Sequence, residues 1–348
     1  MTAKSTVPTI VHLDEQRSIS GFVAAGLTAA TIQHILFLKN QIPFPVAQLG
    51  RLPIPPNSKA SKKRVDLLDA VDALSCHLHS TFSALYSSLA HSPLKYPHRS
   101  GHARVHLLIL LGPSLFRPRS RILLTIDGLK IQTQSYETET GGSTHSENEN
   151  RCYNTSSTLN RVRRLDQARS PLSSLPPTAT NPGRESDSFS SKHAENSTSS
   201  DPTKSPDSSP SSDETFKDHL EEQRVLTAAE RLLSRSLAIT CAEDGVTLNA
   251  ELEPTQTHVL IQAPRGFHHS SWTPRQNMSH GLDSLLTGLR SHAVAAKKER
   301  ASVKTDEIVI YCEYPKVSVA PEGDLENVEA GDLIWWSWDG KIVGFGDP

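Results

Sequence analysis

A long tract of small polar residues limits how much of this chain can fold. From about Gln134 to Thr215 the sequence is almost entirely Ser, Thr, Pro, Asn, Asp and Glu, and the part from Ser170 onward contains 20 Ser or Thr and seven Pro. Such a segment cannot bury enough apolar surface to offset the conformational entropy lost on ordering it. We therefore expect residues 134–215 to be a disordered insertion, which leaves roughly 265 of the 348 residues for ordered structure.

Apolar periodicity returns on both sides of this tract, so the tract either separates two domains or interrupts one. A long loop adds little to the free energy of folding, because closure entropy grows only with the logarithm of loop length. We expect residues 18–133 and 216–348 to form a single domain. Residues 1–17 then supply an N-terminal tail and the first strand.

Three segments have the spacing of amphipathic helices. The first begins at a capping serine, Ser18 or Ser20, and runs to about Asn40, after which two prolines stop it. The second covers about residues 61–89, and its apolar side chains recur every three or four positions. The third covers about residues 218–241 and is predicted to turn one face inward, made of Val225, Leu226, Ala229, Leu232, Leu233, Ser236 and Leu237. A more polar helical stretch is expected near residues 280–300.

Short runs of aliphatic and β-branched residues predict the strands. In chain order the expected strands are residues 7–13, 104–111, 121–126, 246–252, 258–262, 307–314, 332–338 and 341–345. Strands and helices do not alternate as they do in a doubly wound nucleotide-binding fold. The order indicates an α+β fold in which three helices pack on one face of a mostly antiparallel sheet.

Charge and cysteine content argue against several classes of protein. The formal net charge of −2 gives no electrostatic reason to bind nucleic acid or an anionic membrane. The four cysteines lie far apart, which is neither a disulfide framework nor a zinc ribbon and suits a reducing compartment. The longest unbroken aliphatic run is Leu107–Leu111, far shorter than the roughly 20 residues of a membrane span. We therefore expect neither nucleic acid nor a membrane among the partners.

No motif indicates catalysis or a cofactor. The chain lacks the glycine-rich loops that hold nucleotides, the G-x-S-x-G nucleophile motif and the H-E-x-x-H zinc motif. The densest histidine groups are His77 with His79 and His268 with His269. On a helix the first two point to different faces, and neither pair has a carboxylate at ligand spacing, so surface histidines fit better than a metal site. An enzyme of unrecognised type that uses these histidines is one alternative.

Two further clusters have both a functional and a structural interpretation. The basic stretch Lys59–Arg64 is either a nuclear-import signal or a solvated approach to the second helix. The tryptophans among residues 335–338 belong either to the core or to an interface, since indole rings are enriched at protein contacts. For Trp336 we favour the core.

Four segments follow one another in an order known from one protein family. Residues 34–49 read HILFLKNQIPFPVAQL, residues 105–112 read VHLLILLG, residues 230–237 read ERLLSRSL, and residues 332–345 read DLIWWSWDGKIVGF. They are similar, in turn, to four features of the comet family, the Mad-two-binding proteins that silence the spindle checkpoint. These features are a helix followed by Leu-Pro-x-Pro and Gln-Leu, a VLILLGG strand, the third helix, and a closing pattern of aromatic residues and Gly-Phe.

The resemblance covers about Val7–Ile126 and Asp218–Pro348. It implies a HORMA-like fold, with three helices on an antiparallel sheet and a mobile C-terminal "safety belt". It also implies a non-enzymatic adaptor without a cofactor. Such an adaptor binds the closed conformer of the HORMA protein Mad-two and presents it to a hexameric AAA+ ATPase, which dismantles the mitotic checkpoint complex. The expected location is the nucleus, with the cytoplasm and spindle in mitosis.

The same resemblance implies where the partners bind. Mad-two contacts are expected at the end of the first helix and on the third helix, at Leu38, Gln41, Arg231, Leu233 and Arg235. The better-known family members carry glutamine and phenylalanine where this chain has Leu38 and Leu233. An ATPase contact is expected at Trp272, Pro274 and Arg275, in a segment one residue shorter than the family's Trp-x-x-Pro-Lys.

Another HORMA-domain scaffold, of the DNA-repair or autophagy type, is the main alternative within this fold. Such a protein captures a peptide under its own C-terminal belt. The C-terminus distinguishes the two, since a peptide-capturing belt needs a free groove, whereas comet-like proteins fill that groove with their own tail.

Overall fold

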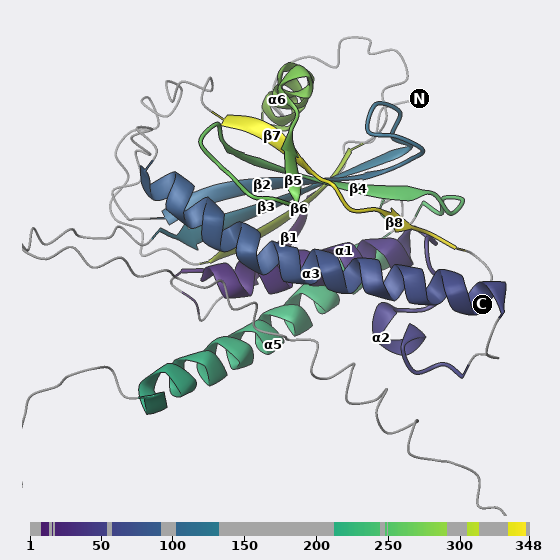
Figure 1. The fold of residues 1–348 in the computed structure, drawn as a ribbon, viewed down its shortest axis with the longest axis horizontal. Helices are drawn as coiled ribbons and strands as arrows, with labels where there is room; N and C mark the ends of the chain where they lie inside the picture. Colours follow the sequence, from purple (N-terminus) through teal and green to yellow (C-terminus); the bar gives the residue numbers. More distant parts are fainter. Residues whose placement is uncertain are drawn as a thin grey trace, which may run out of the picture.

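The computed structural model describes residues 8–13, 16, 18–53, 58–91, 102–131, 212–243, 248, 250–290, 305–312 and 333–345 (Figure 1). Its elements, in chain order, are β1 (Thr9–Leu13), α1 (Gly21–Leu38), α2 (Val46–Leu49), α3 (Lys59–His91), β2 (His102–Leu111), β3 (Ser120–Lys130), α5 (Ser212–Ala242), β4 (Gln256–Pro264), β5 (Trp272–Pro274), α6 (Gln276–Arg290), β6 (Thr305–Cys312), β7 (Leu333–Trp338) and β8 (Ile342–Val343).

The strands form one mixed sheet in the order β1-β6-β3-β2-β4-β7-β5, with β8 paired to β4 beside β7. Strand β6 runs parallel to both of its neighbours, β1 and β3. The other pairings are antiparallel. The expectation of a mostly antiparallel sheet is therefore confirmed for the half that contains β2, β4, β5, β7 and β8, and the β1-β6-β3 half departs from it.

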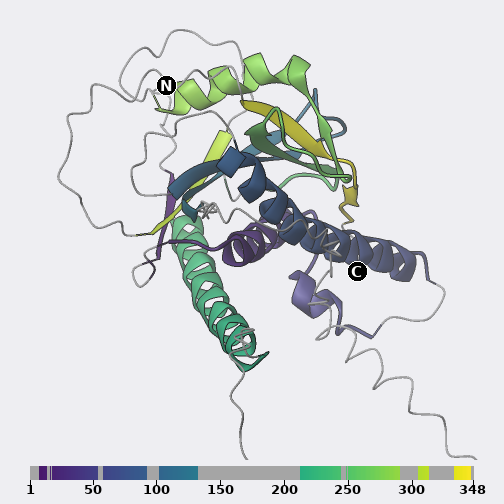
Figure 2. The same cartoon turned by 60° about the vertical axis from the view of Figure 1, so that its left-hand side comes forward.

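Helices cover both faces of this sheet (Figures 1 and 2). On one face α1 packs against α3 and β3, and α5 packs against α1 and β1, so that these helices and the sheet share one apolar core. On the opposite face α6 closes a smaller core around Leu108, Leu260, Leu282 and Trp335. The α+β fold is thus confirmed. The sequence predicts a polar helical stretch near residues 280–300 but not the packing of α6 on the sheet.

Helix α1 is the most enclosed helix of the described chain. Ser20 caps it by accepting a hydrogen bond from the backbone N–H of Val23. Among the described residues, α1 is the one helix long and apolar enough, by length and composition, to cross a membrane. Its sequence contains no long unbroken aliphatic run, because threonine, glutamine and histidine residues interrupt the apolar ones. Most of the helix is buried against protein, which accounts for its apolar composition.

Several element boundaries differ from expectation. The expected strand at residues 246–252 is wrong: its described residues, Leu248 and 250–252, form no strand. Helix α5 begins at Ser212, so the last four residues assigned to the insertion are helical. The rest of the insertion, and the N-terminal tail apart from β1 and its immediate neighbours, lie outside the described residues. The short elements α2 and β5 had no sequence signal long enough to detect.

The tryptophans of β7 are all buried. Trp336 and Trp338 face the α3 side, whereas Trp335 faces α6 and donates from Nε1 to Oδ1 of Asp283 at 3.1 Å. The prediction that Trp336 belongs to the core is confirmed, and Trp335 and Trp338 are core residues as well.

Candidate functional site

Helices α1 and α5 run side by side in the same direction. Phe22 meets His219 at a ring-centroid distance of 5.5 Å, and Leu226 packs so tightly on Gly26 that a methyl group there would lie 2.5 Å from it. Further along, His34 and Ser234 are joined by a hydrogen bond of 2.9 Å between Nε2 and Oγ. Because residues later in α1 meet residues later in α5, the C-terminal ends of the two helices lie together.

Helix α5 has one buried and one exposed stripe. Ala229, Leu233 and Leu237, spaced four apart, face α1 and the sheet, and Leu233 is 0% exposed. The prediction that Leu233 lies at a surface contact is therefore wrong for this conformation. Leu232, one position earlier, reaches solvent instead, at 37% exposed.

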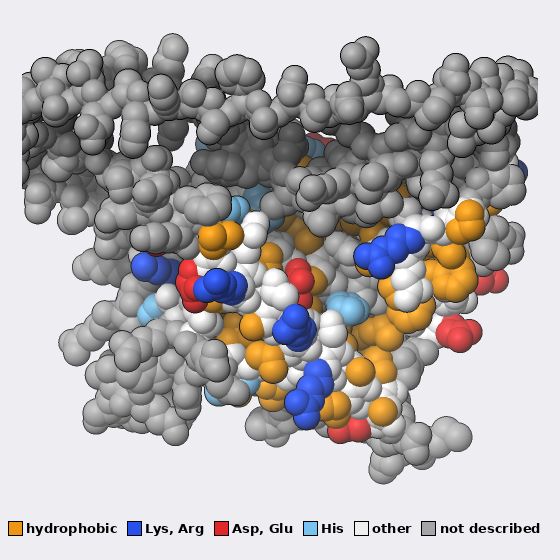
Figure 3. All heavy atoms as spheres, turned by 90° about the horizontal axis from the view of Figure 1, so that it is seen from below, with side chains coloured by type: hydrophobic (Ala, Val, Ile, Leu, Met, Phe, Trp, Pro, Cys, Tyr) orange, Lys and Arg blue, Asp and Glu red, His pale blue; other side chains and the backbone are white. Residues whose placement is uncertain are grey.

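The exposed stripe of α5 is apolar with basic neighbours. Leu232 and Ile239, seven residues apart, lie on the same side of the helix, and Ile239 is 53% exposed. Arg231 and Arg235 are exposed on that side. Figure 3 views the molecule from the side on which α5 lies, and hydrophobic side chains there are interspersed with Lys and Arg. We call Leu232, Ile239, Arg231 and Arg235 the α5 face.

The end of α1 contributes less surface than expected. Leu38 is half-buried and packs against the core, whereas its neighbour Phe37 is 40% exposed. Phe37 follows His34 by three residues and Ile239 follows Ser234 by five, so both lie toward the same end of the helix pair. Phe37 was not predicted as a contact. Its place on the outer side of an otherwise buried apolar helix was the signal that could have found it.

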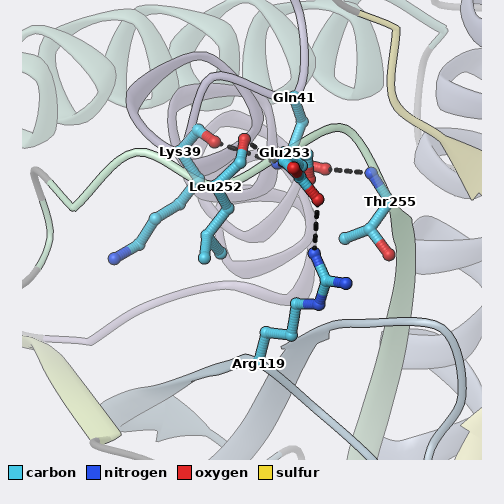
Figure 4. A network of polar contacts seen from close by, with 6 residues as sticks. All are labelled: Lys39, Gln41, Arg119, Leu252, Glu253 and Thr255. Carbon is cyan, nitrogen blue, oxygen red and sulfur yellow. Dashed lines mark hydrogen bonds and ion pairs between the residues drawn. The ribbon is translucent and has the colours of Figure 1, made fainter.

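Gln41 is an internal residue, contrary to the prediction that it touches a partner. It is fully buried. Its Nε2 donates to the carbonyl of Lys39 at 2.9 Å and lies within 3.4 Å of the carbonyls of Leu252 and Glu253, and its Oε1 accepts the backbone N–H of Thr255 at 2.7 Å. Figure 4 shows this Gln41 network, with Arg119 reaching the exposed carboxylate of Glu253.

The Gln41 network also holds the C-terminal segment. The carbonyl of Gln41 accepts the backbone N–H of Phe345 at 2.7 Å, and a methyl group on Gly344 would lie 2.8 Å from that oxygen. The chain after β8 therefore lies directly on the turn after α1, and Phe345 is buried there.

The segment predicted to meet an ATPase is only partly accessible. Trp272 is buried, with its Nε1 donating to Oγ1 of Thr81 at 2.6 Å. Arg275 is half-buried, and its Nε donates to Oγ of Ser337 at 2.8 Å. Of the three predicted residues, Pro274 is the exposed one.

Two of the histidine groups come together although they are far apart in sequence. His77 in α3 and His269 in the turn before β5 have ring centroids 6.2 Å apart. Among the described residues there is no group of three or more His, Cys, Asp or Glu that could hold a metal ion. Ser80 lies 2.8 Å from His269 Nε2, but His269 Nδ1 accepts the Ser271 N–H. The neutral ring therefore carries its proton on Nε2 and cannot act as a base toward Ser80.

The basic stretch Lys59–Arg64 forms the first turns of α3. Lys59, Lys62 and Lys63 are exposed, whereas Arg64 Nη1 donates to the carbonyl of Leu52. The nuclear-import interpretation stays a prediction for these three lysines.

Comparisons with known proteins add no assignment. No protein-family model and no curated protein sequence matches this chain.

Proposed function

We propose that this chain is a non-enzymatic adaptor with a HORMA-like fold, which binds the closed conformer of Mad-two and presents it to a AAA+ remodelling ATPase. By this role it would silence the spindle checkpoint by promoting disassembly of the mitotic checkpoint complex. Support comes first from the four resembling segments. They fall on the α1–α2 region, on β2, on α5 and on β7–β8, which are elements of the types that the resemblance requires.

The α5 face is the observation that carries this proposal. Leu232 and Ile239 are two exposed aliphatic side chains on one side of a helix, and a partner that covers them would gain free energy by removing their apolar surface from water. Arg231 and Arg235 flank them, and a rim of charge of this kind sets the rate and salt dependence of association. A partner helix with an apolar stripe and acidic neighbours would match this surface.

The burial of Leu233 and Gln41 changes which residues carry the contact. Both hold the fold together, so Leu232, Ile239 and Phe37 take the central positions in the proposed contact. Arg231, Arg235 and the half-buried Leu38 stay at its border. The adaptor must bind closed and open Mad-two with different affinity, since equal affinity would shift neither population.

The proposed ATPase contact includes Pro274 and the edge of the sheet at β5. In the described conformation Trp272 donates a hydrogen bond to Thr81 and Arg275 donates one to Ser337, so both side chains hold β5 in place and are not available to a partner. They become contacts only if β5 separates from α3 and β7.

The C-terminal pairing favours the adaptor over a scaffold that captures a peptide. Strands β7 and β8 of this chain occupy the edge of β4, and Phe345 is fixed at Gln41. A peptide-capturing scaffold needs a free groove for a foreign peptide beside its belt, whereas an adaptor of the comet type fills that groove with its own C-terminal tail.

Purified components test the proposal. Wild-type protein should co-precipitate with Mad-two locked in the closed conformer and not with Mad-two locked open. Leu232→Glu should lose this binding while its melting temperature changes little. Val65→Glu is the matched control, because Val65 is also 37% exposed on a helix but lies on α3. Equal capture of both conformers would contradict the proposal.

A further inference from the structure

His77 fastens the end of β7 to α3. The indole Nε1 of Trp338 donates a hydrogen bond to Nδ1 of His77 at 3.0 Å. Trp338 is the last residue of β7 and is almost fully buried. Because the indole N–H is only a donor, this contact requires a His77 ring with an unprotonated Nδ1.

His269 fastens the turn before β5 to the same helix in the same way. Its Nδ1 accepts the backbone N–H of Ser271 at 3.2 Å, which leaves the proton on Nε2. Nε2 lies 2.8 Å from the hydroxyl of Ser80, one turn of α3 beyond His77. Only the neutral Nε2–H form of His269 satisfies both contacts.

We propose that His77 and His269 form an acid-sensitive clamp, which holds the β5–β7 edge of the sheet on α3 when both rings are neutral and releases it when they are protonated. A second proton on either ring must go to Nδ1. There it faces the N–H of Trp338 or of Ser271, so an attractive contact becomes a donor–donor contact. The clamp follows from the fold of this chain and holds whether or not the chain binds Mad-two.

The surroundings of His269 favour its neutral state. Burial lowers the pKa of His269, and the nearby charge of His77 lowers it further. The carboxylate of Asp339, which follows Trp338, is engaged by the hydroxyl of Thr273 at 2.6 Å. The other titratable or charged groups on α3 are Lys59, Lys62, Lys63, Arg64, Asp66, Asp69, Asp72, Cys76, His79, Tyr86 and His91. The turn carries Arg265 and His268, and Arg275 follows β5.

The segments joined by the clamp are linked to one another as well as to α3. Trp272 donates its backbone N–H to the carbonyl of His269 at 3.1 Å, and Asp339 donates its own to the carbonyl of Ser271 at 3.0 Å. Release of the two histidines would therefore loosen the turn, β5 and the end of β7 together. It would also expose Trp272, which is now buried against Thr81.

Amide hydrogen exchange at about pH 7.5 and pH 5.5, corrected for intrinsic exchange, tests the clamp by bracketing the ordinary histidine pKa. In the wild type, acid should lower the protection of β5 and β7 by about fivefold, the factor that one lost hydrogen bond corresponds to, relative to the β2–β3 hairpin. In His77→Asn/His269→Gln, which keeps an acceptor for Trp338 and a donor for Ser80 but cannot titrate, protection should not change with pH.

Two more variants complete the test. His91→Gln, at the exposed end of α3, should keep the wild-type response. Trp338→Phe removes the indole donor together with part of the ring, so it should lower protection of β7 at neutral pH and weaken the pH dependence even if the double variant folds poorly. Equal wild-type protection at both pH values, or an undiminished acid response in the double variant, would overturn the clamp.

Discussion

Lys39 and Asp306 form an ion pair in the interior of the protein, with 3.2 Å between Nζ and Oδ2 and side-chain exposures of 2% and 4%. The pair joins the residue after α1 to β6, the strand that runs parallel to both of its neighbours. It therefore ties the C-terminal end of α1 to the half of the sheet whose strands pair in parallel.

Removing one partner of this pair should be far more destabilising than removing both. Lys39→Met leaves the buried carboxylate of Asp306 without its cation, and we expect a loss of about 3–5 kcal/mol in the free energy of unfolding. Lys39→Met/Asp306→Leu should recover a large part of that loss. Chemical denaturation of the two single variants and the double variant gives the coupling energy. A double variant as unstable as the sum of the singles would show that the two residues act independently.

Gln41→Ala should lower the free energy of unfolding by about 2–3 kcal/mol, because it leaves the buried N–H of Thr255 and several carbonyls without their partner. Gln48→Ala, at an exposed position in α2, is the matched control and should change stability by less than about 0.5 kcal/mol. Denaturant titration compares the two variants. Equal stability of both would mean that the Gln41 network contributes nothing to the fold.

Substitutions of the neighbouring leucines of α5 should differ in how much they destabilise the fold. Leu233→Ala opens a cavity in the core and should cost about 2–5 kcal/mol. Leu232→Ala removes a side chain from the surface and should cost less than about 1 kcal/mol. Thermal unfolding of the two variants under one set of conditions distinguishes them. If Leu232→Ala were the more destabilising, the assignment of buried and exposed stripes on α5 would be reversed.

Acid should weaken the fold. Burial lowers the pKa values of His34 and His258 below their ordinary value of 6.5, so the folded chain takes up these protons less readily than the unfolded chain. The stability that their neutral forms provide is present above pH 6.5 and is lost as the pH falls below it. The free energy of unfolding should therefore be lower at about pH 5.5 than at pH 7.5. His34→Gln should reduce this difference, whereas His91→Gln should leave it unchanged.

Local patterns predict the elements whose apolar spacing is unambiguous. Helices α1 and α3 and strands β2 and β4 lie where periodicity or an aliphatic run indicates them. Residues 246–252 mislead because their alternation resembles a strand, while the carbonyls of Leu252 and Glu253 are taken up by Gln41 instead of by a strand partner. The parallel pairing of β6 with β1 joins residues about 300 positions apart. The spacing of apolar residues within a short segment cannot predict a pairing over that distance.

The candidate site was harder to predict than the fold. Seven residues of α5 between positions 225 and 237 were predicted to face inward together, and Leu232 is the one among them that is exposed. The spacing of four among Ala229, Leu233 and Leu237 identifies the buried stripe and leaves Leu232 outside. The meeting of His77 with His269 depends on tertiary structure alone, since the two residues belong to distant elements.

Calorimetric titration of Mad-two into this protein tests the central claim most directly. The wild type should bind closed-locked Mad-two at least tenfold more tightly than open-locked Mad-two. Ile239→Glu should weaken binding to the closed form about 30-fold, corresponding to about 2 kcal/mol at the centre of an interface. Val65→Glu should bind as the wild type does. Equal affinity for the two conformers, or unchanged binding by Ile239→Glu and Leu232→Glu, would contradict an adaptor that works through the α5 face.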